Sequence, residues 1–274
     1  MNLDFGQIAA SSGGVMQILE DCGISYMFTT VDGGRSSAPF ASANLGFHVG
    51  DNPSDVAYNR RRAQEKIGKP IVWMDQVHGA RIAPVTGGKL GEIALDSYGF
   101  YSAGEADGMI LERSQTPRSG LALAVMVADC VPVLLADVTG RRIAAIHMGR
   151  AGMEKNIVGK AIDLFIERGS RPENIAAWFG PHICGRCYEV DDDLAQRMPS
   201  AVRSLTRWGT PGIDIAYGGV LQAQQRRVRV EVSAQCTYED ANYYSHRRAT
   251  HQQHSTGRFA GVISLQPGDT PVKY

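Results

Sequence analysis

The strongest constraint on the fold is one long apolar run, LALAVMVADCVPVLLAD, over residues 121–137. A run rich in Val, Leu and Ala without polar alternation is typical of strand that is buried on both faces of a sheet. Shorter apolar segments bounded by Gly or polar turns are ISYMFTT (24–30), PIVWMDQV (70–77) and RIAAIHM (142–148). The sequence therefore predicts a mostly buried sheet.

Three segments have the pattern of helices. SDVAYNRRRAQEKIG (54–68) begins with a Ser cap and ends at Gly68, and MEKNIVGKAIDLFIERG (153–169) ends at Gly169 and places its apolar residues on one face. A third helix is expected over 214–227, followed by a strand in VRVEVSA (228–234). Because strands and helices alternate without a regular βαβ order, the sequence predicts an α+β fold.

Length and composition limit the classes of protein to which the chain can belong. Its 274 residues are 43% hydrophobic, which is enough for a substantial core, and no repeat or linker divides them, so we expect one domain over 1–274. Lys plus Arg and Asp plus Glu each number 28, so the formal charge is zero and no nucleic-acid partner is expected. The sequence has no signal-peptide pattern and no membrane-spanning window, which predicts a cytoplasmic protein without a membrane partner.

The Asp129-Cys130 step inside the apolar run is the first candidate for chemistry. An unpartnered carboxylate among apolar residues is costly, so Asp129 needs a hydrogen-bond partner or a function. His78 and His147 lie at the ends of two other expected strands, which can be neighbours of the first. Taken singly, a buried Cys usually packs as a small hydrophobe, and a His at a strand end is usually a hydrogen-bonded core residue.

Ten short blocks occur in an order that resembles one protein family. They are TTVDGG (29–34), SANLGFHVGD (42–51), NR (59–60), WMDQVHG (73–79), ADCVPVLLAD (128–137), AIHMG (145–149), FGPHICGRCYEV (179–190), CTYED (236–240), YYSHRR (243–248) and TGR (256–258). Over nearly its whole length the chain resembles the multicopper polyphenol oxidase or laccase-domain family, also described as purine nucleoside phosphorylases of the peptidoglycan editing factor type. The resemblance implies a single layered α/β/β/α-type domain with mixed sheets.

The resemblance also implies a zinc ion bound by His78, Cys130 and His147. Two imidazoles and a thiolate are suitable zinc ligands, and three protein ligands leave a fourth position open, as in catalytic zinc sites. Copper is an alternative because sulfur also suits Cu(I), but a multicopper oxidase needs more His ligands than seven His without a His-X-His pair provide. Cys130, Asp129 and His147 are the residues expected to carry catalysis, with Asp129 accepting a hydrogen bond from a ligand imidazole or facing substrate.

The activity implied by the resemblance is the phosphorolysis of adenosine, inosine, guanosine or methylthioadenosine, together with the deamination of adenosine. The expected partners are therefore small molecules, a purine nucleoside and phosphate, and the chain is expected to be a monomer or a homodimer. An open zinc site gives deamination a physical basis because it activates water. The residues expected to bind substrate are Asn44, His48, Arg60, Arg150, Arg247 and Arg248.

Two departures from the family pattern affect phosphate and nucleoside binding. Val31 stands where the family motif Thr-Thr-Arg-x-Gly-Gly has Arg, and residues 147–152 read HMGRAG where the family has His-Ala-Gly-Trp-Arg-Gly. Arg150 supplies a guanidinium one residue earlier than the family arginine, and a side chain one residue along points in another direction. The expected metal ligands are unchanged.

Other classes of function stay open on the sequence. Cys130 can be the nucleophile and His147 the base of a cysteine hydrolase that acts on a peptidoglycan precursor, with Asp129 orienting the base. A zinc-stabilised domain without catalytic activity is a further alternative.

A second cysteine motif lies in the block at 179–190. Cys184 and Cys187 form a C-x-x-C pair, but the chain has no second such pair to complete a four-Cys zinc site. We expect a turn beside the site here, with Tyr188 and Glu189 contributing to the pocket, and a structural role for Cys236.

Overall fold

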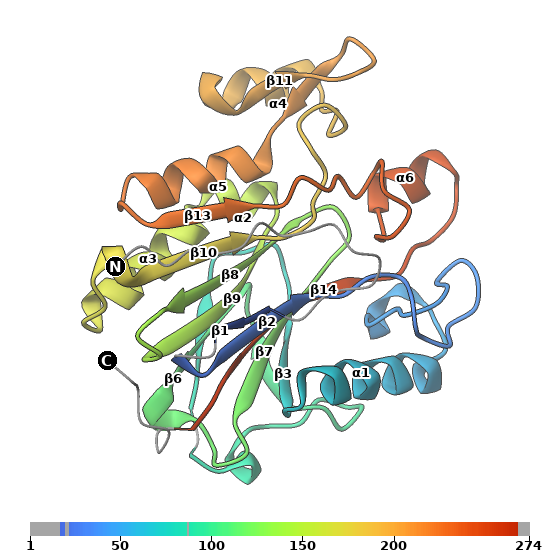
Figure 1. The fold of residues 1–274 in the computed structure, drawn as a ribbon. Helices are drawn as coiled ribbons and strands as arrows, with labels where there is room; N and C mark the ends of the chain where they lie inside the picture. The colour runs from blue at the N-terminus through green and yellow to red at the C-terminus, as the bar shows by residue number, and fades with distance from the viewer. Residues whose placement is uncertain (1–16, 20–21, 87, 268–274) are drawn as a thin grey trace.

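The fold has four layers (Figure 1). The computed structural model describes residues 17–19, 22–86 and 88–267. Two six-stranded mixed sheets pack face to face, and helices cover the outer face of each sheet. The expected α+β class and α/β/β/α layering are thereby confirmed. Within the described residues, no helix has the length and apolar character needed to cross a membrane.

The first sheet joins strands from both ends of the described chain. Its order is β1 (Gln17–Leu19), β2 (Ile24–Phe28), β14 (Phe259–Leu265), β7 (Leu121–Val127), β3 (Ile71–Asp75) and β5 (Ser102–Glu105). In this sheet β1, β2, β14 and β7 pair with one another in antiparallel fashion, in that order, whereas β3 is parallel to both β7 and β5.

The second sheet is built mainly from the middle of the chain. Its order is β13 (Arg229–Val232), β10 (Ile175–Phe179), β8 (Val131–Asp137), β9 (Arg142–Met148), β6 (Gly108–Glu112) and β4 (Ile82–Val85). The two edge strands, β13 and β4, pair in parallel with their neighbours, and the other pairs are antiparallel. A separate hairpin consists of β11 (Arg203–Leu205) and β12 (Pro211–Ile213).

Helices cover the outer faces of both sheets. The α-helices are α1 (Pro53–Ile67), α2 (Arg150–Glu154), α3 (Ile157–Glu167), α4 (Asp192–Arg197), α5 (Ile215–Gln224) and α6 (His246–His251). Short 3-10 helices span Phe47–Val49, Leu90–Glu92, Arg113–Gln115, Pro172–Asn174 and Ser200–Val202. Helix α1 packs on the first sheet, and α3 and α5 pack on the second (Figure 1).

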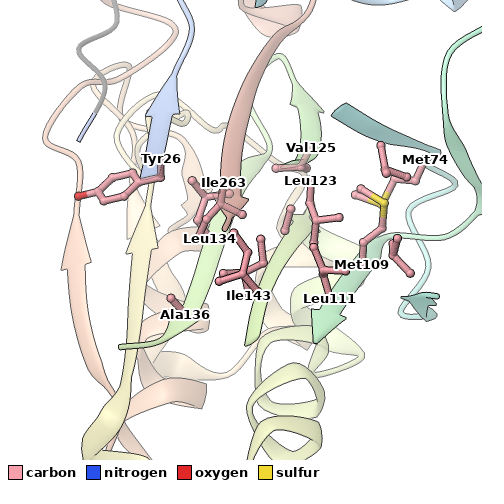
Figure 2. Close-up of a cluster of buried hydrophobic side chains, with 14 of the residues drawn as sticks. Tyr26, Met74, Met109, Leu111, Leu123, Val125, Leu134, Ala136, Ile143 and Ile263 are labelled. Carbon is pink, nitrogen blue, oxygen red and sulfur yellow. The ribbon is translucent and has the colours of Figure 1, made fainter. Parts of the chain in front are cut away.

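The main core lies between the two sheets (Figure 2). Leu123 and Val125 of β7 face Leu134 of β8 and Ile143 of β9 across this space. The alternate residues of β7 point the other way, where Ala124 packs in the cluster under α1. Both faces of the strand are therefore buried, which explains why its sequence is continuously apolar.

The apolar run over 121–137 is two strands, so its interpretation as a single strand was wrong. β7 belongs to the first sheet and β8 to the second, and the chain crosses between the sheets at Ala128–Cys130. Asp129 at this crossing has a φ of 89°. The crossing places the Asp-Cys step at the ends of two strands.

The expected helix over 153–169 is also divided. α2 begins at Arg150 and α3 begins at Ile157, with Asn156 at a φ of 59° between them. This left-handed residue interrupts the helical backbone. Helix α1 is displaced by one residue from the expected 54–68, and β9 covers the expected 142–148. Helix α5 lies within the expected 214–227 and ends three residues earlier.

Candidate functional site

Three side chains from separate parts of the chain converge at the crossing between the sheets. His78 follows β3, Cys130 lies between β7 and β8, and His147 is in β9. One ring nitrogen of each histidine and the sulfur of Cys130 all lie within 4.8 Å of one another, with 3.8 Å between Cys130 Sγ and His78 Nε2. His147 is buried and His78 is exposed, so the cluster opens to one side. These three residues can bind one metal ion.

The backbone around the cluster is unusual in two ways. His78 and Asp129 have φ values of 57° and 89°, a region that residues with side chains rarely occupy and that often marks functional sites. Gly149 approaches the cluster so closely that a Cβ atom there would lie 3.1 Å from Cys130 Sγ and 3.0 Å from His78 Cδ2. The space beside the sulfur is therefore kept free of side-chain atoms.

A buried carboxylate contacts both histidines. Asp107 accepts hydrogen bonds from His147 Nδ1 at 2.8 Å and from the backbone N–H groups of His78 and Gly79 at 2.9 and 2.6 Å. Burial acts to raise the pKa of Asp107, but the hydrogen bonds from His147 and Gly79 lower it below its usual value. Since Asp107 occupies Nδ1, the Nε2 atom of His147 is the one available to a metal.

The thiol and the buried imidazole change each other's protonation. Burial alone raises the pKa of Cys130, but His147 and His78 lower it to about 6. Burial likewise lowers the pKa of His147, yet the Cys130 thiolate and Asp107 raise it to about 9. Both shifts favour a thiolate beside an imidazolium over the neutral pair. A metal cation binds the same two groups by replacing the proton.

The sequence suggested that Asp129 accepts a hydrogen bond from a ligand imidazole, but Asp129 does not contact the buried His147 in this way. Its carboxylate accepts hydrogen bonds from Thr237 Oγ1 and from the backbone N–H of Arg247, both at 2.6 Å. The carboxylate on His147 is that of Asp107. Asp129 therefore fastens the chain around Thr237 and Arg247 to the wall of the site, and this compensates its burial.

The cluster opens into a cavity of about 960 Å³, which is within the range of small-molecule sites. The metal-ligand candidates and Asp129 line it, as does Tyr188, which was expected beside it. Four of the residues expected to bind substrate also line it: His48, Arg60, Arg150 and Arg247. Arg60 is buried with its guanidinium 4.2 Å from the ring centroid of Trp73 and paired with Asp96, and burial lowers its pKa to about 10.

Asn44 and Arg248 do not line the cavity. The Asn44 amide donates to Gly46 O and Asp51 and accepts from the backbone N–H groups of Gly46 and Arg258. Arg248 donates to backbone carbonyls between Thr237 and Tyr243. Both side chains hold loops in place, so the expectation of direct substrate contact is replaced by a positioning role.

Sequence reasoning missed three features of the site. Asp107 is a single Asp before the strand GMILE, and no motif marks it. Arg258 lines the cavity but was not among the residues expected to bind substrate. Its place in the TGR block was a signal that could have identified it. Phe47 and Tyr98 also line the cavity and stack with their ring centroids 3.7 Å apart. Their separation in the sequence gave no sign of this contact.

Comparison with known proteins places this geometry in a family. Residues 25–266 match the family model described as multi-copper polyphenol oxidoreductase laccase. The chain is 40% identical over 250 residues to a protein of Mycobacterium tuberculosis named purine nucleoside phosphorylase, covering 89% of this chain and 92% of that protein. It is 33% identical over 252 residues to the Shigella flexneri protein named purine nucleoside phosphorylase YfiH, covering 89% and 94%.

Solved structures agree with the sequence comparison. The crystal structure of YlmD from Geobacillus stearothermophilus has a TM-score of 0.79 and 29% identity, covering 96% of this chain and 98% of that one. A hypothetical protein YfiH from Bacillus licheniformis also has a TM-score of 0.79, with 29% identity and coverage of 94% and 98%. The chain therefore belongs to the laccase-like family that includes the YfiH-type proteins.

Proposed function

We propose that the protein is a zinc-dependent enzyme that processes purine nucleosides, by phosphorolysis of adenosine, inosine, guanosine or methylthioadenosine and by deamination of adenosine. The observation that carries the proposal is the convergence of His78, Cys130 and His147 at a cavity large enough for a nucleoside. The names of the relatives, purine nucleoside phosphorylase, support the same class of substrate.

The donor set fits zinc. A thiolate and two imidazole nitrogens are typical zinc ligands, and the Asp107 hydrogen bond gives His147 the tautomer that binds metal through Nε2. Zinc held by three protein ligands supplies a Lewis acid that activates water or polarises a substrate group. Copper suits sulfur as well, but within the described residues the two clusters able to hold a metal contain only these two histidines, which does not favour multicopper chemistry.

The cavity walls offer one surface for a purine ring and another for phosphate. The stacked pair Phe47 and Tyr98 offers an aromatic surface for a purine ring. Arg150, Arg247 and Arg258 offer guanidinium N–H donors for phosphate oxygens. In phosphorolysis, a phosphate oxygen forms a bond to the anomeric carbon as the bond to the purine nitrogen breaks. The arginines would neutralise and orient the attacking phosphate.

The products formed from adenosine test the proposal. The purified protein is incubated with adenosine, with and without phosphate, and the bases and nucleosides are separated by chromatography. Adenine formed only with phosphate supports phosphorolysis, and inosine formed without phosphate supports deamination. A Cys130→Ser variant that retains both activities, or a wild-type protein that forms neither product, would contradict the proposal.

A second candidate, a cysteine hydrolase, is favoured by the thiolate–imidazolium pair of Cys130 and His147. Chelation separates the two candidates. Activity on a peptidoglycan precursor that survives removal of metal and is abolished by iodoacetamide at Cys130 supports the hydrolase. Loss of nucleoside activity on chelation, with recovery on addition of zinc, supports the metalloenzyme.

A further inference from the structure

A second group of potential metal ligands lies outside the His-Cys-His cluster. The sulfur atoms of Cys184, Cys187 and Cys236 all lie within 4.8 Å of one another, and all three residues are free thiols. Cys187 and Cys236 are buried. Cys184 and Cys187 are in the loop after β10, and Cys236 is in the loop after β13, so the cluster joins two segments about 50 residues apart. The C-x-x-C pair thus has a third thiol beside it that sequence spacing did not indicate.

The local backbone arranges the three sulfurs as ligands. The N–H groups of Cys187 and Tyr188 both donate to Cys184 O, at 2.9 and 3.0 Å, which turns the two thiols of the pair toward the same side. The backbone N–H of Cys184 donates to Cys236 Sγ at 3.3 Å. A hydrogen bond to sulfur favours the thiolate, the form of cysteine that binds metal.

A carboxylate lies beside one of the three thiols. Glu239 Oε1 lies 3.6 Å from Cys187 Sγ. Around tetrahedral zinc, with sulfur at about 2.3 Å and carboxylate oxygen at about 2.0–2.2 Å, adjacent sulfur and oxygen ligands are about 3.5 Å apart. The guanidinium groups of Arg186 and Arg207 both pair with Glu239 and bring positive charge to a group that carries excess negative charge when metal is bound.

We propose that the three converging thiols of Cys184, Cys187 and Cys236 bind a second zinc ion, and that Glu239 turns from beside Cys187 to complete a closed four-ligand site of the structural kind. The ion would fasten the two loops together at the wall of the cavity. Both loops contact Asp129: Ile183 N donates to Asp129 O at 3.0 Å, and Thr237 Oγ1 donates to its carboxylate. Because Asp129 precedes Cys130, the second ion stabilises the segment that carries a ligand of the first cluster.

Zinc content per chain tests this proposal directly. The full-length protein is purified under reducing conditions and its zinc is measured by mass spectrometry, for the wild type, Cys187→Ser, Cys130→Ser and the double variant. We expect two zinc ions in the wild type, one in each single variant and none in the double variant. Cys22→Ser is the matched control, because Cys22 lies outside both clusters, and it should retain two.

The outcomes separate this site from the site of the proposed function. A wild type with one zinc that Cys130→Ser removes would overturn the second site and leave the first intact. One zinc that Cys187→Ser removes, and Cys130→Ser does not, would support the second site and contradict the first. A disulfide among the three cysteines of the reduced preparation would also overturn the proposal.

Cobalt provides a measurement that does not depend on the folding of Cys187→Ser. Co²⁺ is added to metal-free Cys130→Ser protein, in which the remaining cluster would bind one equivalent. We expect an intense thiolate-to-cobalt absorption band that saturates at one equivalent, and no such band would contradict the proposal.

Discussion

Asp107 connects the two histidines of the candidate metal centre although no motif marks it. It is fully buried and accepts hydrogen bonds from the His147 ring and from the backbone of His78 and Gly79. Asp129, which the sequence brings to attention because of its apolar neighbours, instead contacts Thr237 and Arg247. Sequence alone cannot tell which of these two carboxylates contacts the metal-ligand histidines, because the contacts join residues that are far apart in the chain.

Replacing Asp107 by Asn should weaken metal binding by about 10- to 100-fold, the usual effect of losing the partner of a ligand histidine. The amide also replaces one carboxylate oxygen by an NH2 group, which faces the backbone donor of either His78 or Gly79, and this should lower the free energy of unfolding by about 1–3 kcal/mol. Competition with a metal chelator and urea denaturation measure the two effects. Asp129→Asn is the control, and equal loss of metal affinity in both variants would contradict the assignment.

Arg150 occupies the position of the family tryptophan and lines the cavity. If it binds phosphate, Arg150→Ala should raise the KM for phosphate by about 10- to 150-fold, because a hydrogen bond to a charged group contributes about 1.5–3 kcal/mol. Initial rates against phosphate concentration measure this. Exposed Arg171, which does not line the cavity, is the control position, and equal KM values for Arg150→Ala and wild type would rule out this role.

His48 should be neutral at pH 7. Desolvation of its ring at the cavity wall, together with the nearby guanidiniums of Arg258 and Arg60, lowers its pKa below the usual 6.5. The unfolded chain therefore binds this proton more readily than the folded protein, so His48 contributes to a loss of stability as the pH falls below 6.5. NMR titration of the His48 ring should give a midpoint below that of a histidine in an unstructured peptide, and a higher midpoint would contradict this.

The strands were more predictable than the way in which they connect. Apolar segments indicated β2, β3 and β9 because strands buried on both faces are short and continuously hydrophobic. The crossing between β7 and β8 gave no such signal, because the same apolar pattern suits both sheets. The positive φ of Asp129 that makes the crossing is also hidden, because a glycine is the usual sign of such a turn.

The apolar face of helix α3 packs against the outer face of the second sheet. Phe165 is fully buried among the residues of β9, β10 and α5. Phe165→Ala should lower the free energy of unfolding by about 3–5 kcal/mol, because the large side chain leaves a cavity that the sheet cannot fill. In urea denaturation, Glu167→Ala on the exposed side of the same helix should change stability by no more than about 0.5 kcal/mol. Similar losses in the two variants would contradict the packing of α3.

The four layers bring the metal-ligand candidates together from both sheets. His78 follows a strand of the first sheet, His147 is in the second, and Cys130 lies on the segment that passes between them. The resemblance to the laccase-like family implies this ligand set, and the fold explains how residues so far apart in sequence come close enough to bind one ion. A metal bound here would join the two sheets and add its binding free energy to the stability of the whole molecule.

X-ray diffraction at the zinc absorption edge shows whether His78, Cys130 and His147 bind zinc together. Crystals of the zinc-loaded protein are measured just above and just below the edge, and the difference in anomalous signal locates zinc alone. We expect a peak among His78 Nε2, Cys130 Sγ and His147 Nε2, which disappears in Cys130→Ser crystals. A zinc-loaded wild-type crystal without a peak at this position would show that these three residues do not form a zinc site.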